Sequence, residues 1–335
     1  MTAPPGFAAL HGGASSAVLL PALGGKIREL TLGGRQWLWH NPELPFGESP
    51  AGAPYATAGD SGGMDECFPT IAAGVMPTHV RGGGSLVLAD HGALWNRAPE
   101  LTIRTEAAGH AATCVWRGDA WPWNFARTLR MLPSGEVHFA YELRNEGANK
   151  LPFMWAAHPL FPLTPHTRIE LPEGARTRVW SQMGADFGGV GAEHQWPRLR
   201  VGAATADVSR PWTALKEPYA CKVFVSLPKR PCVLALIEGE ARLELLVDGR
   251  EIPYVGLWIN REGWTPFARS RGWRFWQRAP RPYANIGIEP CLGAPDSLSE
   301  AIGSWDSASW VEPGATAHWS MTWRASQIIT QPPTG

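Results

Sequence analysis

Short apolar runs that alternate with polar residues constrain the fold of this chain more than any other feature. Residues 136–144, Glu-Val-His-Phe-Ala-Tyr-Glu-Leu-Arg, repeat with a period of two, which is typical of a half-buried strand. The 37 glycines and 31 prolines are scattered between such runs, and no window carries a long capped helical stripe. We therefore predict an all-β fold of antiparallel strands. The clearest runs are residues 85–88, 112–116, 137–143, 222–226, 233–237 and 242–247.

The organisation of the chain indicates a single domain. A length of 335 residues could hold two domains, but large all-β folds also reach this size as one. The composition does not shift along the chain, and no repeat of 20–50 residues is visible. We expect one domain over residues 1–335, with its core at about 20–325. Residues 41–63, 180–197 and 260–283 have the composition of loops.

Charge and cysteine usage exclude several classes of partner. The formal net charge is zero, so the chain has no global reason to bind nucleic acid or an anionic membrane surface. No stretch reaches the roughly 18 apolar residues of a membrane span, and the start lacks a signal-peptide pattern. The five cysteines are odd in number and widely spaced, which argues against a disulfide framework or structural zinc site. We therefore expect a cytoplasmic protein.

Two motifs place an ionisable side chain immediately before a proline. His158 lies in the run 153–161, Phe-Met-Trp-Ala-Ala-His-Pro-Leu-Phe, and Glu289 in the run 285–291, Asn-Ile-Gly-Ile-Glu-Pro-Cys. Because proline interrupts a strand ladder, we predict that both residues lie at or near strand ends, where they can reach a cleft. Apolar neighbours would raise the pKa of Glu289 and make it a better base near neutrality. Taken alone, a buried structural histidine and a salt-bridged glutamate remain the alternatives.

Two further segments carry candidate site residues. In the run 90–97, a His-Gly turn bends the backbone behind His91, and Arg97 could reach the same pocket. In the run 62–70, paired glycines allow close backbone approach to a ligand, followed by Asp65 and Glu66. Adjacent residues of an extended segment point to opposite faces, so at most one of these two acids would face a given pocket.

Other catalytic patterns are missing from the sequence. There is no GxGxxG after a strand, no Walker loop, no HExxH and no GxSxG. The histidines show no zinc-helix spacing, so we predict neither a metal site nor a cofactor. The 18 tryptophans suit stacking on sugar rings, although core packing is the more frequent role for any one of them.

The order of these motifs resembles the aldose 1-epimerase family. The likeness is carried by residues 121–129 (Trp-Pro-Trp-Asn-Phe-Ala-Arg-Thr-Leu), by 137–145, and by the His-Pro-x-Phe ending of 153–161. It continues in residues 287–298, Gly-Ile-Glu-Pro-Cys-Leu-Gly-Ala-Pro-Asp-Ser-Leu, in Asp-His-Gly at 90–92, and in the opening segment 24–30. Each match is short, and their order and spacing together make the resemblance specific.

The resemblance implies a fold and a set of roles. The fold is a β-supersandwich of antiparallel strands, galactose mutarotase-like, with a sugar cleft on its concave face. His158 matches the histidine that protonates the ring oxygen, and Glu289 matches the base that takes the anomeric hydroxyl proton. His91 matches a second histidine that hydrogen-bonds the ring region. The implied activity is isomerisation between the α and β anomers of a sugar, without cofactor or metal.

The sequence departs from the family pattern at three places. Where many relatives carry an early arginine in the sugar site, this chain offers Asp65 and Glu66. The family also has an aspartate between the histidine and the glutamate, which we cannot assign among residues 186, 207 and 248. Lys222 is a candidate additional substrate contact, with a strand-edge lysine as the alternative.

An arginine-rich segment precedes the glutamate strand. Residues 260–283 hold six arginines and one acid, Glu262, interleaved with aromatic residues. A solvated loop or a subunit contact is the ordinary interpretation. The alternative is a lid in which Arg271 and Arg274 hold an anionic group of a phospho- or sulfo-sugar.

The function hypotheses that remain all involve a small-molecule sugar. The first is a mutarotase acting on a neutral or an anionic sugar, and the second is a non-catalytic carbohydrate-binding protein. A glycosidase would normally use two carboxylates rather than a histidine and a glutamate. We expect a monomer or a homodimer.

Overall fold

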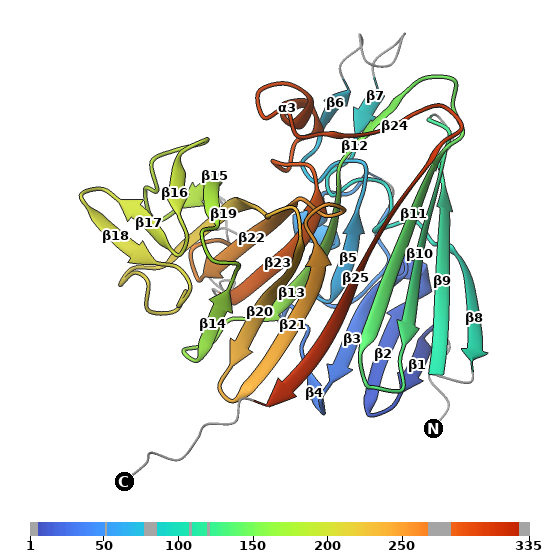
Figure 1. Cartoon of the computed structure of the whole chain (residues 1–335), viewed down its shortest axis with the longest axis horizontal. Helices are drawn as coiled ribbons and strands as arrows, with labels where there is room; N and C mark the ends of the chain where they lie inside the picture. Colours follow the sequence, from blue (N-terminus) through green and yellow to red (C-terminus); the bar gives the residue numbers. More distant parts are fainter. Residues whose placement is uncertain are drawn as a thin grey trace, which may run out of the picture.

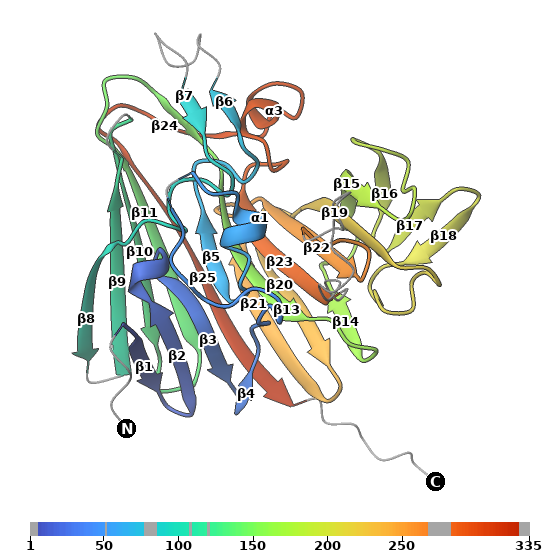
Figure 2. The ribbon, with the colours of Figure 1, turned by 180° about the vertical axis from the view of Figure 1, so that it is seen from behind.

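The computed structural model describes residues 6–50, 52–76, 86–106, 109–118, 121–266 and 283–327. Nearly all regular structure in them is β, and the strand pairs that form the sheets are antiparallel, so the predicted all-β antiparallel fold is confirmed. Figures 1 and 2 show two large sheets lying face to face, with β15 to β18 extending at one end.

The larger sheet has 13 strands. Its order is β1 (Ala8–Gly12), β2 (Ser15–Leu20), β3 (Lys26–Leu32), β5 (Met64–Cys67), β13 (Trp155–Pro162), β23 (Ala284–Leu292), β22 (Tyr254–Arg261), β19 (Tyr219–Ser226), β15 (Arg176–Met183), β16 (Glu193–Gln195), β17 (Arg198–Val201) and β18 (Ala204–Asp207). The short strand β4 (Arg35–Gln36) pairs with β3.

The second sheet has eight strands. Its order is β14 (Thr167–Glu170), β20 (Pro231–Glu238), β21 (Ala241–Asp248), β25 (Thr316–Gln327), β11 (Val137–Asn145), β10 (Trp123–Met131), β9 (Gly109–Arg117) and β8 (Glu100–Glu106). Two small ribbons pair β12 (Leu151–Phe153) with β24 (Ser309–Val311), and β6 (Gly74–Met76) with β7 (Leu86–Leu88). The helices among the described residues are short: η1 (Pro21–Leu23), α1 (Tyr55–Ala58) and α3 (Leu298–Ile302).

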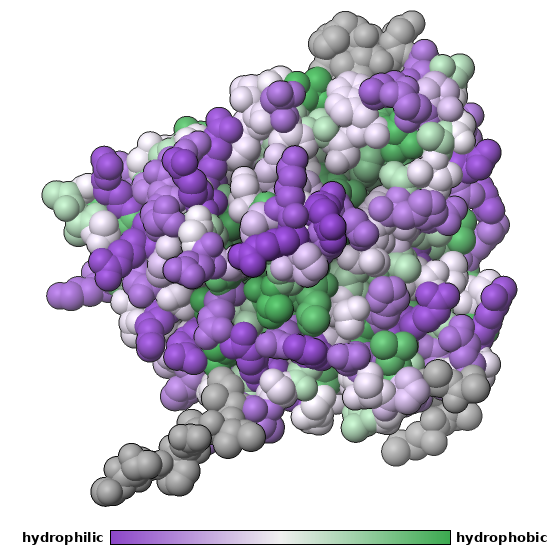
Figure 3. Space-filling model, in the orientation of Figure 1, coloured by the Kyte–Doolittle hydropathy of each residue, from purple (hydrophilic) through white to green (hydrophobic). Residues whose placement is uncertain are grey.

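The main core lies between the two large sheets. Strand β10 alternates buried and half-buried residues along its whole length, as a strand with one covered face must. Its Phe125 packs against Trp319 of β25 with ring centroids 5.9 Å apart, and Trp319 lies 5.2 Å from Trp155 of the facing sheet. Each buried aromatic side chain removes a large apolar area from water. Hydrophilic side chains spread over much of the outer face of the eight-stranded sheet (Figure 3).

The 13-stranded sheet is covered on both faces near its middle. Strand β13 is buried at seven consecutive positions and β23 at eight, unlike the alternating strands of the other sheet. One face packs on the core, and loops lie over the other, with α1 in front of the strands in Figure 2. Side chains on this second face therefore line a covered space.

Two strand-end predictions are wrong. His158 lies inside β13, and Glu289 lies inside β23, which continues to Leu292. In β13 the proline is tolerated because the residues between Ala156 and Leu160 are not paired with β23. Pro159 therefore does not have to donate a backbone hydrogen bond to that strand. Among the described residues no helix has the length and apolar character of a membrane span.

Candidate active site

A cavity of about 310 Å³ opens on the covered face of the 13-stranded sheet. Its walls combine residues from the middle strands with residues from the segments that connect strands. They are Tyr55, Ala56, Asp60, Ile71, Ala72, Asp90, His91, His158, Leu160, Ser181, Met183, Lys222, Trp258, Trp264, Asn285, Glu289 and Asp296. We call it the catalytic cavity, after the role that we propose for it in the next section. Ionisable, amide and aromatic groups converge in it, as in sites that bind small polar ligands.

One imidazole–carboxylate contact in the cavity joins neighbouring strands. His158 on β13 and Glu289 on β23 approach to 3.9 Å between Nε2 and Oε1. Glu289 is fully buried, and its Oε1 has no hydrogen-bond partner among the described residues. A buried carboxylate oxygen without a donor is costly, so it is available to a ligand that brings one.

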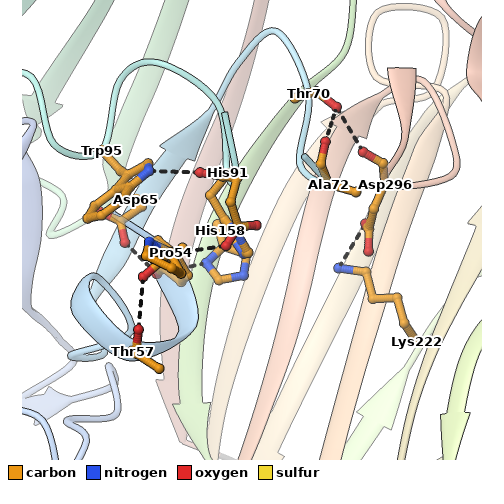
Figure 4. A network of polar contacts seen from close by, with 12 residues as sticks. Pro54, Thr57, Asp65, Thr70, Ala72, His91, Trp95, His158, Lys222 and Asp296 are labelled. Atoms are coloured by element: carbon orange, nitrogen blue, oxygen red, sulfur yellow. Dashed lines mark hydrogen bonds and ion pairs between the residues drawn. The ribbon is translucent and has the colours of Figure 1, made fainter. Parts of the chain in front are cut away.

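Lys222 holds the other oxygen of Glu289. Its Nζ donates to Oε2 of Glu289 and lies 3.6 Å from Oδ1 of Asp296. Lys222 is on β19, and it reaches β23 across the intervening strand because that strand carries Gly256 opposite Glu289. A Cβ at Gly256 would lie 3.0 Å from Cε of Lys222 and 3.3 Å from Oε2 of Glu289. Figure 4 shows Lys222 directed at Asp296.

The charge state of this group follows from burial and pairing. Burial raises the pKa of Glu289 above its usual value, and the Lys222 ammonium opposes that rise. Burial would lower the pKa of Lys222, but the carboxylates of Asp296 and Glu289 raise it well above its usual value. Lys222 is therefore a permanent cation beside a carboxylate that accepts a proton more readily than usual.

A polar chain stands behind His158. The phenol of Tyr55 donates to Oδ2 of Asp65 at 2.6 Å and lies 3.4 Å from Nδ1 of His158. Lys26 Nζ lies 2.8 Å from the same oxygen of Asp65. Burial raises the pKa of Tyr55 well above its usual value, so its hydroxyl remains a donor to Asp65 and its oxygen accepts from Nδ1–H of His158. This arrangement leaves Nε2 of His158 facing Glu289.

The pKa of His158 moves in the opposite direction to that of Glu289. Burial lowers it well below the usual imidazole value, and the positive charges of His91, Lys222 and Lys26 lower it further. The two shifts bring the proton affinities of the imidazole and the carboxylate toward each other.

His91 lies on a tight turn beside this pair. Its backbone has φ of 57°, and the following Gly92 has φ of 79°. A Cβ at Gly92 would meet the carbonyl oxygen of Phe68 at 2.1 Å, so the turn requires glycine. The His91 ring stacks on Tyr55 at 3.8 Å and meets His158 edge-on at 5.1 Å. Asp90 Oδ1 lies 2.9 Å from Nδ1 of His91 and orients the ring.

Another part of the cavity wall carries hydrogen-bonding groups beside indole rings. Burial raises the pKa of Asp60 to about 7, and the Tyr283 hydroxyl donates to its Oδ2 at 3.3 Å. Trp258 Nε1 donates to Oδ1 of Asn285 at 3.1 Å, and Trp264 meets Trp258 edge-on at 5.7 Å. Carboxyl, amide and indole groups in one wall suit a ligand with hydroxyls and C–H faces.

Comparison with known proteins supports the fold. No protein-family model matches the sequence, and no curated protein matches it. Among the solved structures that resemble it over nearly their full lengths are three bacterial proteins. The Slr1438 protein of Synechocystis sp. is 16% identical with a TM-score of 0.65, covering 97% of each chain. A galactose mutarotase related enzyme of Lactobacillus acidophilus is 13% identical with a TM-score of 0.62, covering 97% of this chain and 99% of the other. A protein of Escherichia coli K12 provisionally named as an aldose 1-epimerase is 12% identical with a TM-score of 0.62, covering 96% and 99%. The chain has the galactose mutarotase-like fold.

On this galactose mutarotase-like scaffold, four residues singled out in the sequence meet at the catalytic cavity. They are His158, Glu289, His91 and Lys222. Asp65 is not part of the wall, because Tyr55 stands between its carboxylate and His158. It is therefore placed to orient His158 rather than to touch a ligand.

The predicted substrate contact by Glu66 is corrected by its position. Glu66 points into the core, where it accepts hydrogen bonds from Arg127 at 3.2 Å, Trp155 at 2.8 Å and Tyr141 at 3.2 Å. The physical reason is the alternation of a strand, which sends neighbouring residues of β5 to opposite faces. Arg97 also lies away from the cavity wall. Arg271 and Arg274 lie outside the described residues.

The cavity contains residues that the sequence did not single out. Asp186 and Asp207 are exposed, and Asp248 pairs with Arg250 on the surface. The carboxylates at the cavity are instead Asp60, Asp90 and Asp296. Asp296 could have been identified from the sequence, because it lies in the Ala-Pro-Asp-Ser part of the same motif, residues 287–298, that contains Glu289. Tyr55 comes from a loop whose composition carried no signal of a site.

Proposed function

We propose that this protein is an aldose 1-epimerase (mutarotase) that uses Glu289 as the base and His158 as the acid. The observation that supports this most directly is the 3.9 Å approach of His158 Nε2 to Oε1 of Glu289 at a cavity wall, where that oxygen has no hydrogen-bond partner among the described residues. In an aldopyranose, the anomeric hydroxyl oxygen and the ring oxygen are bonded to the same carbon. An acid and a base only a few ångströms apart can therefore reach both oxygens at once.

The reaction conserves protons within the site. Oε1 of Glu289 removes the proton of the anomeric hydroxyl, the C1–O5 bond breaks, and O5 takes a proton from Nε2 of His158. The resulting open-chain aldehyde rotates about the C1–C2 bond. The O5 hydroxyl then attacks the other face of the carbonyl and returns its proton to His158, while Glu289 returns its proton to the new anomeric oxygen. General acid and base catalysis of this kind contributes about 10²–10⁴-fold for each group.

The opposed pKa shifts suit a reversible reaction. Ring opening moves one proton equivalent from His158 to Glu289 through the sugar. Burial raises the pKa of Glu289 and lowers that of His158, so the states before and after this transfer come closer in free energy. A small difference lets the enzyme run in both directions without trapping the aldehyde state.

The described wall of the cavity favours an uncharged sugar ring. Four carboxyl groups face one lysine, and that lysine is engaged by Glu289 and Asp296. An anionic group placed against this wall would meet net negative charge. A phospho- or sulfo-sugar would therefore need its anion elsewhere.

The test is polarimetry of a freshly dissolved single anomer of glucose or galactose. We expect the wild-type protein to accelerate equilibration without any added cofactor. Glu289→Gln and His158→Asn should each lower kcat by at least about 10²-fold. The matched controls are Glu142→Gln and His318→Asn, because these two side chains also lie 3.9 Å apart but are mostly exposed.

The controls should keep wild-type activity. A binding protein without chemistry would bind sugar and leave the rate of equilibration at its spontaneous value in every variant. That result, or full activity in either cavity variant, would contradict the proposal.

A further inference from the structure

A second cavity, of about 270 Å³, lies on the same sheet face as the catalytic cavity. It is lined from strands β15, β16, β19 and β22 and from the segment after β23. Its residues are Arg176, Thr177, Arg178, Glu193, Phe224, Ser226, Tyr254, Ala294, Trp305 and Ser307. We call it the aromatic cavity, after Phe224, Tyr254 and Trp305.

The two cavities adjoin along the strands. On β19, Lys222 lines the catalytic cavity, and Phe224, two residues further, lines the aromatic cavity. Residues two apart on a strand share a face and lie about 7 Å from each other. The cross-strand partners continue this order, since Ser181 pairs with Lys222 and Arg178 pairs with Phe224. A ligand that fills one cavity can therefore extend along the sheet into the next.

Contacts among its own wall residues fix the shape of the aromatic cavity. The Arg178 guanidinium lies over the Trp305 ring, 3.8 Å from its centroid. Trp305 meets Phe224 edge-on at 6.0 Å, and its backbone N–H donates to the carbonyl of Glu300 at 2.9 Å. These contacts hold the aromatic rings and the guanidinium in fixed positions.

Unused hydrogen-bonding groups face this cavity. Within the described part of the chain, the Arg178 guanidinium donates to no carbonyl or carboxylate, and the Tyr254 hydroxyl has no hydrogen-bond partner. Arg176 differs, because it pairs with Glu193 at 2.9 Å. Apolar faces next to free planar donors recognise a ring that carries both C–H groups and hydroxyls.

We propose that the aromatic cavity binds the second ring of a reducing oligosaccharide whose reducing-end ring occupies the catalytic cavity. The inference rests on the proposed function, because it assigns the reacting ring to Glu289 and His158. An uncharged ring is favoured over a phosphate, because Arg176 is already paired with Glu193 and Arg178 holds its guanidinium over the Trp305 ring. The rest of the lining is made of aromatic, hydroxyl and alanine side chains. The substrate class is thus a reducing di- or oligosaccharide.

The experiment compares the mutarotation of lactose, maltose and cellobiose with that of glucose and galactose. We expect at least one disaccharide to have a kcat/KM about tenfold above that of its reducing-end monosaccharide. Arg178→Ala and Trp305→Ala should remove that advantage and change the monosaccharide values by less than about twofold. Tyr254→Phe is a milder variant that keeps the ring and should lower the disaccharide value alone.

The matched control is Trp310→Ala. Trp310 is 42% exposed and also carries a cation on its ring, with Lys150 Nζ 5.6 Å from the centroid, but it lines neither cavity. This variant should keep the disaccharide preference.

The outcomes separate the two proposals. Equal kcat/KM for mono- and disaccharides, a preference for hexose 6-phosphates lost in Arg178→Ala, or parallel losses on both sugar classes would overturn the inference while leaving mutarotase activity intact. If no sugar is turned over, the proposed function fails, and calorimetry decides the inference. Tighter binding of a disaccharide than of its monosaccharide, lost in Arg178→Ala, would support the second-ring site, and equal binding would overturn it.

Discussion

Replacing Lys222 by methionine probes how the base is tuned. The change removes the ammonium that donates to Oε2 of Glu289 and keeps a side chain of similar length. Glu289 is fully buried, and Lys222 is the hydrogen-bond donor that the structure gives to its carboxylate. The variant therefore leaves Glu289 buried without its cation, and its ionised form becomes less favourable.

The size of the effect follows from the distance and the burial. An opposite charge in contact lowers a carboxyl pKa by about 1–3 pH units. Loss of Lys222 should raise the pKa of Glu289 by a similar amount, which corresponds to about 1.4–4 kcal/mol. At neutral pH, less of the base is then ionised, so we expect kcat/KM to fall about 10- to 100-fold.

The assay is the pH dependence of kcat/KM, measured by polarimetry on wild type and Lys222→Met. The maximum of a bell-shaped profile lies midway between the pKa values of the base and the acid, so a rise of about 1–3 units for Glu289 should move the maximum to higher pH by about 0.5–1.5 units and lower its height. A merely structural role of Lys222 would lower activity equally at all pH values. A maximum that stays at its wild-type pH would refute this reasoning.

Unfolding gives an independent check with a defined sign. The folded-state pKa of Glu289 is raised above its unfolded value, so the unfolded chain loses this proton first. Between the two pKa values the folded state binds more protons, and the free energy of unfolding falls as the pH rises through that window. The window should be wider in Lys222→Met than in wild type, as chemical denaturation at several pH values would show.

Three further predictions concern the surroundings of the pair. Tyr55→Phe removes the hydroxyl that connects His158 to Asp65. It should lower kcat about tenfold in steady-state polarimetry, with little change in KM. An unchanged kcat would show that Tyr55 does not position His158. The pKa of Glu289 is raised and that of His158 is lowered. The wild-type profile of kcat/KM against pH should therefore be a narrow bell, with its maximum between the ordinary pKa values of the two groups, 4.5 and 6.5. A broad plateau above neutrality would contradict the opposed shifts. Glu66→Gln should lower the free energy of unfolding by about 3–5 kcal/mol, because it leaves Arg127 without its buried anionic partner. The kcat per folded molecule should stay near wild type. A loss of kcat with full stability would place Glu66 in the site.

The fold could be predicted because its signal is local and repeated. The alternation of residues 136–144 corresponds to β11, whose positions alternate buried and less buried. The same rule anticipated that Asp65 and Glu66 would face opposite sides. It could not say which side faced the core, because that depends on the buried Arg127, which lies far away in the sequence.

Proline positions were less informative about the site. We expected Pro159 and Pro290 to end their strands. Both lie inside strands, because pairing with the neighbouring strands of the sheet continues beyond each proline. His158 and Glu289 therefore sit on continuous strands, which hold them more rigidly than strand ends would.

The loop residues of the cavity could not be predicted from pattern. Tyr55 and Asp60 come from a segment without periodicity, and their roles depend on contacts with Asp65 and Tyr283 that exist only after folding. Lys222 was named from the sequence as a candidate substrate contact, with a strand-edge lysine as the alternative, but its reach to Glu289 depends on the register that places Gly256 between them.

The most direct test of the account is exchange NMR on a sugar already at anomeric equilibrium. A catalyst of ring opening must raise the α-to-β and β-to-α rates by the same factor and leave the anomer ratio unchanged. We predict exchange cross-peaks between the two anomeric protons with wild-type protein, and their loss with Glu289→Gln and with His158→Asn at equal concentration of folded protein. Exchange at the spontaneous rate with the wild type, for every mono- and disaccharide tested, would contradict the assignment of Glu289 and His158 as a catalytic pair.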